Sequence, residues 1–276
     1  MRIAIIADPL DNQHAGVHIY TKSFIEALVR YDTENEYILL RERKDEALPL
    51  RQIEVPNIRL PIGFASIRLF LIIPIILRFL KVDAVIEPAH FGPFNLPKRI
   101  KRITVIHDLT PIIFPHYHRY HSQLLQNIFL KHILRKTDLI LTVSQNSAND
   151  IHRIYPFTKD KVVPILLDAE EIYQPQSNTD FLTEKKITQP YFLSVGTIEP
   201  RKNLILLLDA FTHFKTTTQS DVQLVISGGK GWKSEAFFDK LEAHPYRSDI
   251  HILGYVKKEA LPQLYSHAQA LVYPSL

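Results

Sequence analysis

The segment 191–211, YFLSVGTIEPRKNLILLLDAF, contains the pattern from which most of this chain is built. An apolar run of strand length, Tyr191–Val195, ends at Gly196, and a stretch with apolar residues at helical spacing follows two cations, Arg201 and Lys202. A continuous apolar strand followed by a helix is typical of a parallel sheet that is covered by helices on both faces. The segment therefore predicts an α/β fold.

The same alternation runs along the rest of the chain. Before this segment we predict strands at 2–7, 37–40, 84–87, 103–107, 139–144 and 162–167, and helices at 18–31, 66–80, 120–135 and 146–155, the last capped by Ser144. After it we predict helices at 204–214, 235–243 and 260–268, and strands at 223–227, 251–254 and 270–273.

A polar segment, Asp168–Asn178, interrupts the alternation. We therefore predict two Rossmann-like, doubly wound domains, residues 1–172 and 173–276, that face a cleft between the carboxyl ends of their sheets. The second domain is short for such a fold, and we expect it to be incomplete at its carboxyl end.

The composition is that of a globular protein, with 46% hydrophobic and 22% charged residues among 276. A net charge of +4 is too weak to indicate nucleic acid, but it suits an anionic ligand such as a diphosphate or an anionic membrane surface. The absence of cysteine excludes disulfides and thiolate chemistry. No secretory signal pattern is visible at the start, and we expect a cytoplasmic protein.

Two segments leave a membrane contact open. The apolar stretch 67–80, IRLFLIIPIILRFL, is too short to cross a hydrocarbon core of about 30 Å, so it is either a buried core helix or a helix that lies on a membrane surface. A basic cluster is either a solvated loop or a contact for phospholipid headgroups or an anionic acceptor; it consists of Lys98, Arg99, Lys101 and Arg102.

The two cations in the segment 191–211 form the strongest candidate site. Arg201 and Lys202 stand just before a helix that begins near Asn203, so a guanidinium, an ammonium and a helix N-terminus are directed at one place. A diphosphate fits this arrangement, and a solvated helix start is the alternative. The run Gly228–Gly231 lacks the spacing of a phosphate-binding P-loop and indicates a turn after a strand.

The first half offers a second group of candidates. Gly16 precedes a helix, where it either lets the backbone approach a phosphate or simply makes a turn. His107 and Asp108 follow a buried strand, where they could bind a sugar hydroxyl or an acceptor. The alternative is a structural role, in which the histidine only forms hydrogen bonds within the protein at the end of the strand. We expect no metal site, because the spacing of four further histidines is wrong for one: His90, His116, His118 and His121.

Five strings of this sequence resemble the family 4 (group 1) glycosyltransferases, in the branch of bacterial mannosyltransferases that build surface polysaccharides. Segments 191–211, 224–232 (LVISGGKGW) and 251–275 (HILGYVKKEALPQLYSHAQALVYPS) are similar to their donor-binding half. Segments 105–115 (VIHDLTPIIFP) and 139–151 (LILTVSQNSANDI) are similar to their acceptor-side half. The resemblance covers nearly the whole chain in the expected order.

The resemblance implies the two-domain GT-B fold and transfer of a hexose such as mannose, with retention of configuration, from a nucleotide diphosphate sugar to a glycan or lipid-linked acceptor. GDP-mannose is the expected donor substrate, and no metal or other cofactor is expected. Catalysis is expected from His107 and Asp108. Donor binding is expected from Gly16, Gly196, Arg201, Lys202, Tyr255 and Val256.

One departure from the family pattern leaves an alternative open. Family members continue with an E-G-F-G-like segment and a second glutamate that hold donor hydroxyls, whereas this sequence stops at Leu276. A truncated, inactive remnant that at most binds nucleotide is therefore the alternative to an enzyme. A GT-B sugar-nucleotide epimerase would share the architecture, but it would not share the IEPRKN and HDLTP strings.

Overall fold

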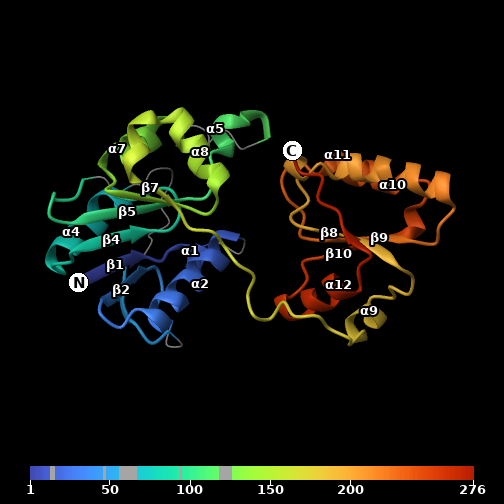
Figure 1. Cartoon of the computed structure of the whole chain (residues 1–276), viewed down its shortest axis with the longest axis horizontal. Helices are drawn as coiled ribbons and strands as arrows, with labels where there is room; N and C mark the ends of the chain where they lie inside the picture. Colours follow the sequence, from blue (N-terminus) through green and yellow to red (C-terminus); the bar gives the residue numbers. More distant parts are fainter. Residues whose placement is uncertain (13–15, 46–47, 56–66, 94, 118–125) are drawn as a thin grey trace. The chain divides into compact units, whose positions relative to one another are not determined.

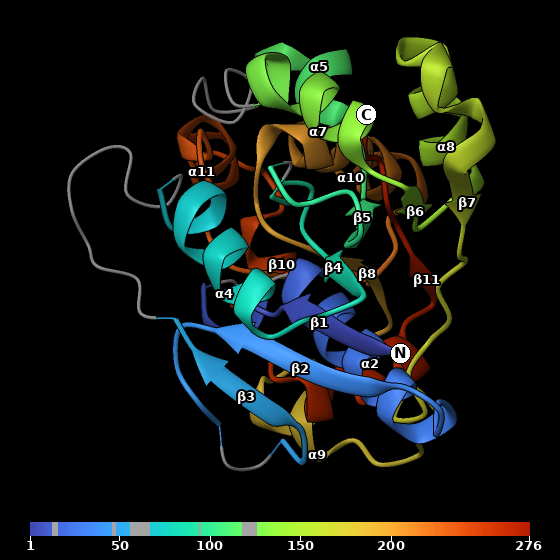
Figure 2. The same cartoon turned by 90° about the vertical axis from the view of Figure 1, so that its left-hand side faces the viewer.

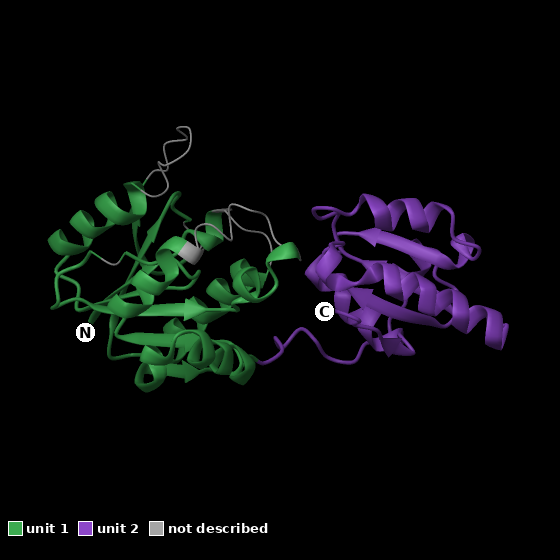
Figure 3. Cartoon of the chain, turned by 90° about the horizontal axis from the view of Figure 1, so that it is seen from above, with its two compact units in different colours: residues 1–167 green, residues 168–276 purple. Residues whose placement is uncertain are grey.

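The computed structural model describes residues 1–12, 16–45, 48–55, 67–93, 95–117 and 126–276. The chain divides into two compact units, Met1–Leu167 (unit 1) and Asp168–Leu276 (unit 2), which Figure 3 shows in different colours. The division expected at 172/173 lies five residues further along, in the same polar segment. Each unit is described by itself below.

A parallel sheet of seven strands forms the centre of the described part of unit 1, in the order β3-β2-β1-β4-β5-β6-β7. Its strands are β1 (Arg2–Ile6), β2 (Glu36–Arg41), β3 (Arg51–Glu54), β4 (Ala84–Glu87), β5 (Lys101–Ile106), β6 (Leu139–Thr142) and β7 (Val162–Pro164). Figure 2 shows β3, β2 and β1 following one another. The strand order reverses between β1 and β4, as in a doubly wound fold.

Helices cover both faces of this sheet (Figure 1). They are α1 (Pro9–Asn12), α2 (Gly16–Tyr31), η1 (Arg68–Ile72), α4 (Ile73–Phe79), α5 (Thr110–Ile113), η2 (Pro115–Tyr117), η3 (Gln126–Leu130), α7 (Lys131–Lys136), α8 (Gln145–Ile154) and η4 (Pro156–Lys161). Ile25 of α2 packs in one cluster with Ile5 of β1, and Leu77 of α4 packs in another with Ile6. Because neighbouring strand residues face opposite sides, both faces of β1 are buried.

Unit 2 repeats the plan with a four-stranded parallel sheet in the order β10-β9-β8-β11. The strands are β8 (Tyr191–Val195), β9 (Gln223–Ser227), β10 (Ile250–Gly254) and β11 (Ala270–Leu271). The helices are α9 (Asp180–Glu184), η5 (Pro200–Lys202), α10 (Leu204–Thr218), α11 (Glu235–Glu242), η6 (Arg247–Asp249), η7 (Lys258–Ala260) and α12 (Leu261–His267). Helices α10 and α11 cover one face, and α9 and α12 the other (Figure 1).

The structure confirms the α/β fold with parallel, doubly wound sheets, and strands β4, β8 and β9 have the expected bounds. Ser144 caps α8 as expected, since its Oγ accepts the Ser147 N–H at 3.1 Å. Strand β3 and the short helices α1, α5 and α9 were not expected, and β6, β7 and β11 end earlier than expected. Part of the helix expected at 120–135 lies outside the described residues. No described helix is long and apolar enough to span a membrane.

Candidate active site

The topology of each sheet marks the place where a ligand is expected. In doubly wound folds, ligands bind beyond the carboxyl ends of the strands at the point where the strand order reverses. That point lies between β8 and β11 in unit 2 and between β1 and β4 in unit 1. The expected site residues Gly196, Arg201 and Lys202 follow β8, whereas Gly16 and His107 follow β1 and β5.

Glycines let three strand ends of unit 2 approach each other closely. The Gly196 N–H donates to the Ser227 carbonyl at 2.8 Å, and the Gly228 N–H donates to the Gly254 carbonyl at 2.7 Å. A Cβ at Gly228 would lie 1.8 Å from the Gly196 carbonyl oxygen, so only glycine fits there. This packing gives the glycine run after β9 a structural role. The interpretation of Gly228–Gly231 as a turn is wrong, because Lys230 forms a parallel β-bridge with Ile198 and the turn comes only at Trp232 and Lys233.

Arg201 is held by a buried carboxylate that the sequence analysis did not include in the site. Its Nε and Nη2 donate to Oε1 of Glu199 at 3.1 and 2.8 Å. The Glu199 side chain is only 3% exposed, whereas that of Arg201 is 31% exposed. One edge of the guanidinium is therefore fixed, and its partly exposed remainder can reach a ligand.

Lys202 lies across Gly196 and contacts the segment that follows β11, on the other side of the reversal. A Cβ at Gly196 would lie 3.3 Å from Lys202 Cε. The Lys202 ammonium contacts the Tyr273 hydroxyl and lies 4.2 Å from the centre of that ring. Burial lowers the pKa of Lys202, and the charge of Arg201 lowers it further against the opposing effect of Glu199.

The two residues after β10 differ in what they can offer a ligand. The Tyr255 side chain is exposed, but Val256 is buried and packs in the core cluster that contains Leu264 of α12. A ligand could therefore meet the ring of Tyr255, whereas the side chain of Val256 is not accessible. Their expected position near a nucleobase stays a prediction.

In unit 1, the ring of His107 is fixed by the turn after β4. Its Nε2 donates to the Pro88 carbonyl at 2.8 Å, since that oxygen can only accept, and its backbone N–H donates to Nε2 of His90 at 2.8 Å. The Tyr20 ring lies perpendicular to it, with the ring centres 4.8 Å apart. Burial lowers the pKa of His107, against the effects of the Pro88 carbonyl and Asp108, and so favours the neutral ring.

Asp108 and Gly16 have simpler surroundings. Oδ1 of Asp108 accepts the backbone N–H of Thr110 at 3.0 Å and its hydroxyl at 2.6 Å, so the carboxylate forms an Asx turn just before α5. Gly16 is the first residue of α2, and a Cβ there would meet no atom within 4 Å. Sterics therefore do not require glycine at this position. The catalytic role of Asp108 and the contact of Gly16 with a diphosphate stay predictions.

The remaining histidines do not form a metal site in the part of the chain that the structure describes, where no group of three suitable side chains occurs. His90 contacts His107, and burial together with the neighbouring His107 lowers its pKa to about 4. His116 lies in η2, and His118 and His121 lie outside the described residues.

Two family matches account for most of the chain. The family described as "Glycosyltransferase Family 4" matches residues 14–166. This chain belongs to that family. The family described as "Glycosyl transferases group 1" matches residues 176–276, so the two matches fall in the two units one after the other.

Two curated relatives of this glycosyltransferase are named for O-antigen chains. The O-antigen chain mannosyltransferase B of Escherichia coli is 34% identical over 192 residues, which cover 67% of this chain and 50% of the relative. The O-antigen chain mannosyltransferase RfbU of Salmonella typhimurium is 24% identical over 282 residues, which cover 97% of this chain and 74% of the relative. The chain therefore spans about half of the first relative's length and about three quarters of the second's.

Solved structures confirm the GT-B fold. The crystal structure of Anabaena HepE in complex with UDP matches with a TM-score of 0.68 at 13% identity, over 100% of this chain and 74% of that one. At this identity the match shows the fold alone.

Proposed function

We propose that this chain transfers a hexose, mannose, from a nucleotide diphosphate sugar to a glycan or lipid-linked acceptor in the synthesis of a surface polysaccharide, with retention of configuration. The observation that supports this most is the pair Arg201–Lys202 beside Gly196, at the point where the strand order of unit 2 reverses. The names of the two relatives described above, both mannosyltransferases of O-antigen chains, favour mannose and hence GDP-mannose as the donor.

The two cations suit the chemistry of a departing nucleotide diphosphate. When the bond between the sugar and the diphosphate breaks, negative charge develops on the phosphate oxygens, and cations already in place stabilise it. The fork of Arg201, oriented by Glu199, can donate two hydrogen bonds to such oxygens. For Lys202, whose charged form is disfavoured by burial and by Arg201, a nearby dianion restores a favourable partner.

His107 is proposed to act beside the reacting sugar. Its Nε2–H is engaged by the Pro88 carbonyl, so Nδ1 carries the lone pair of the neutral ring. Nδ1 can accept a hydrogen bond from a sugar hydroxyl, and the lowered pKa of His107 keeps this acceptor available at neutral pH.

A peripheral contact with the cytoplasmic face of a membrane is part of the proposal. Four apolar side chains recur every fourth residue along η1 and α4 and remain substantially exposed: Ile67, Leu71, Ile75 and Phe79. Of the basic cluster, Lys98, Arg99 and Lys101 are exposed, and Arg99 donates to the Arg78 carbonyl at the end of α4 at 3.4 Å. An apolar stripe beside cations suits the surface of an anionic bilayer.

The proposal is tested with the purified chain, a panel of GDP-, UDP- and ADP-sugars, and calorimetry with GDP. We expect turnover of GDP-mannose, with water or an added glycan taking the mannosyl group and GDP leaving. Replacing Arg201 and Lys202 together by alanine should weaken GDP binding about a hundredfold or more, because each charge-assisted hydrogen bond contributes about 1.5–3 kcal/mol.

The matched control replaces Lys185 and Lys186 of the same unit by alanine, which removes the same charge away from the site. Equal GDP affinity in the two double variants would contradict the role of the cations. GDP binding without transfer from any donor would favour the alternative of a chain that only binds nucleotide. The anomeric configuration of the product, read by NMR, decides between retention and inversion.

A further inference from the structure

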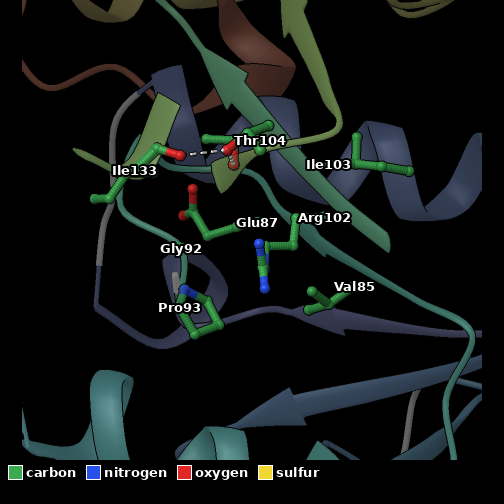
Figure 4. Close-up of a pocket in the computed structure, with 9 residues that line it drawn as sticks. Val85, Glu87, Gly92, Pro93, Arg102, Ile103, Thr104 and Ile133 are labelled. Atoms are coloured by element: carbon green, nitrogen blue, oxygen red, sulfur yellow. Dashed lines mark hydrogen bonds between the residues drawn. The ribbon is translucent and has the colours of Figure 1, made fainter. Parts of the chain in front are cut away.

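Glu87 is a buried carboxyl group that the proposed chemistry does not use. It is the last residue of β4, pairs in register with Thr104 of β5, and is 4% exposed. Figure 4 shows its carboxyl group directed into a small cavity that Thr104, Gly92 and Arg102 help to line. Its Oε1 accepts the backbone N–H of Ala89 at 2.6 Å, and its Oε2 has no hydrogen-bond partner among the described residues.

This position is costly for a carboxyl group. Burial raises the pKa of Glu87 to about 8, so the neutral acid is favoured at pH 7. A leucine would fill similar space without an unsatisfied oxygen. A Cβ at Gly92 would lie 3.1 Å from Glu87 Cβ, so the chain after the turn packs directly on this side chain. Packing alone therefore does not explain an acid at this position.

The contact that distinguishes an acid from leucine is the hydrogen bond to Ala89, which lies in the turn that fixes His107. On one side of Ala89, the Pro88 carbonyl accepts from Nε2 of His107 at 2.8 Å. On the other side, Nε2 of His90 accepts the backbone N–H of His107 at 2.8 Å. The amide that Glu87 holds thus stands between the carbonyl that bonds the His107 ring and the side chain that bonds the His107 backbone.

The turn also needs support from outside. His90 has a φ of 72°, a left-handed conformation that residues other than glycine adopt at a cost. Its backbone N–H donates to the Val105 carbonyl of β5 at 3.1 Å, which ties one end of the turn to the sheet. The bond from Ala89 to Glu87 ties the turn to β4.

We propose that Glu87 is a positioning residue: by accepting the Ala89 N–H, it holds the turn whose Pro88 carbonyl sets the tautomer and orientation of the His107 ring and whose His90 ring holds the His107 backbone. This inference rests on the proposed function in one respect, because it treats His107 as the residue beside the reacting sugar. The geometry of the His107 ring can be measured without any turnover.

Two variants at Glu87 separate the hydrogen bond from the packing. Glu87→Leu fills the space but removes the acceptor, whereas Glu87→Gln keeps an oxygen for the Ala89 N–H. The matched control is Thr104→Val, which removes a hydroxyl from the wall of the same cavity, where it contacts Thr137 at 3.2 Å and not the turn. Circular dichroism and urea unfolding show that each variant is folded.

The first readout is NMR of ¹⁵N-histidine-labelled protein, which reports the protonated nitrogen of each ring. We expect the Nε2–H form of His107 in the unchanged protein, in Glu87→Gln and in Thr104→Val, and a mixture of the two tautomers in Glu87→Leu. The second readout is transfer: kcat should fall about tenfold in Glu87→Leu, equivalent to 1.4 kcal/mol, with the KM for the donor unchanged.

Unchanged His107 signals in Glu87→Leu would overturn the inference. So would a loss in Glu87→Gln as large as that in Glu87→Leu, because glutamine keeps the acceptor. If no donor is turned over by the unchanged protein, the proposed function fails, whereas the NMR comparison still decides the role of Glu87.

Discussion

Replacing Gly228 by alanine tests how the strand ends of unit 2 meet. The added Cβ would lie 1.8 Å from the Gly196 carbonyl oxygen and 2.5 Å from its carbon, whereas ordinary contact begins at 3.4 Å. The two backbones would have to separate by about 1.5 Å, which stretches the hydrogen bond from Gly196 to Ser227. Because both groups are backbone and no flexible side chain can yield, we expect a loss of about 3 kcal/mol or more in the free energy of unfolding.

Urea unfolding followed by tryptophan fluorescence measures this loss. Trp232 is the single tryptophan of the chain and lies in unit 2, so its signal reports the unit that carries the substitution. With a slope of about 2 kcal/mol per molar urea, the midpoint should fall by about 1.5 M. The control is Gly229→Ala, where a Cβ would meet no atom within 4 Å and the midpoint should move by less than about 0.3 M. Equal midpoints for the two variants would refute this account of the strand ends.

Three further predictions concern unit 1. The pKa of Glu87 is about 8 in the folded state and about 4.3 in the unfolded chain, so the folded state holds a proton that the unfolded chain releases. The free energy of unfolding should therefore fall as the pH rises from about 4 to 8. Glu87→Gln should flatten this decline, which is measured as urea midpoints across that pH range. Ser144→Ala removes the cap of α8 and should lower the free energy of unfolding by about 1 kcal/mol, measured by circular dichroism in urea. Phe79→Ser should weaken sedimentation with vesicles of phosphatidylglycerol and phosphatidylcholine about tenfold, whereas Leu206→Ser, an exposed apolar residue of unit 2, should not; equal effects would argue against the stripe as a membrane contact.

The fold could be predicted from sequence wherever a strand is buried on both faces. Strands β4, β8 and β9 are continuous apolar runs, and their bounds followed directly from the hydrophobic pattern. Strand β3 is a partly exposed edge strand that pairs only with β2. Its sequence, RQIE, contains no apolar run, so the hydrophobic pattern did not indicate a strand there. Helix α9 is short, with five residues, and a single turn gives little periodicity.

The candidate site could be proposed from sequence only where its residues are neighbours in the chain. Arg201 and Lys202 stand next to each other, and the string itself indicates them as candidates for binding a diphosphate. The contact of Lys202 with Tyr273 joins residues 71 positions apart, and it exists because β11 pairs with β8 although β9 and β10 come between them in the chain. A single sequence contains no signal for that pairing, since all four strands are apolar and parallel.

A buried glutamate positions a candidate site residue in each unit, and the sequence indicated neither of these two glutamates. Glu199 orients the guanidinium of Arg201, and Glu87 holds the turn that orients His107. Each acid lies where an apolar residue of similar size would avoid the cost of desolvating a carboxyl group, so neither is explained by stability. What each adds is a fixed direction for a side chain, and a site that stabilises developing charge depends on such directions being set before the reaction.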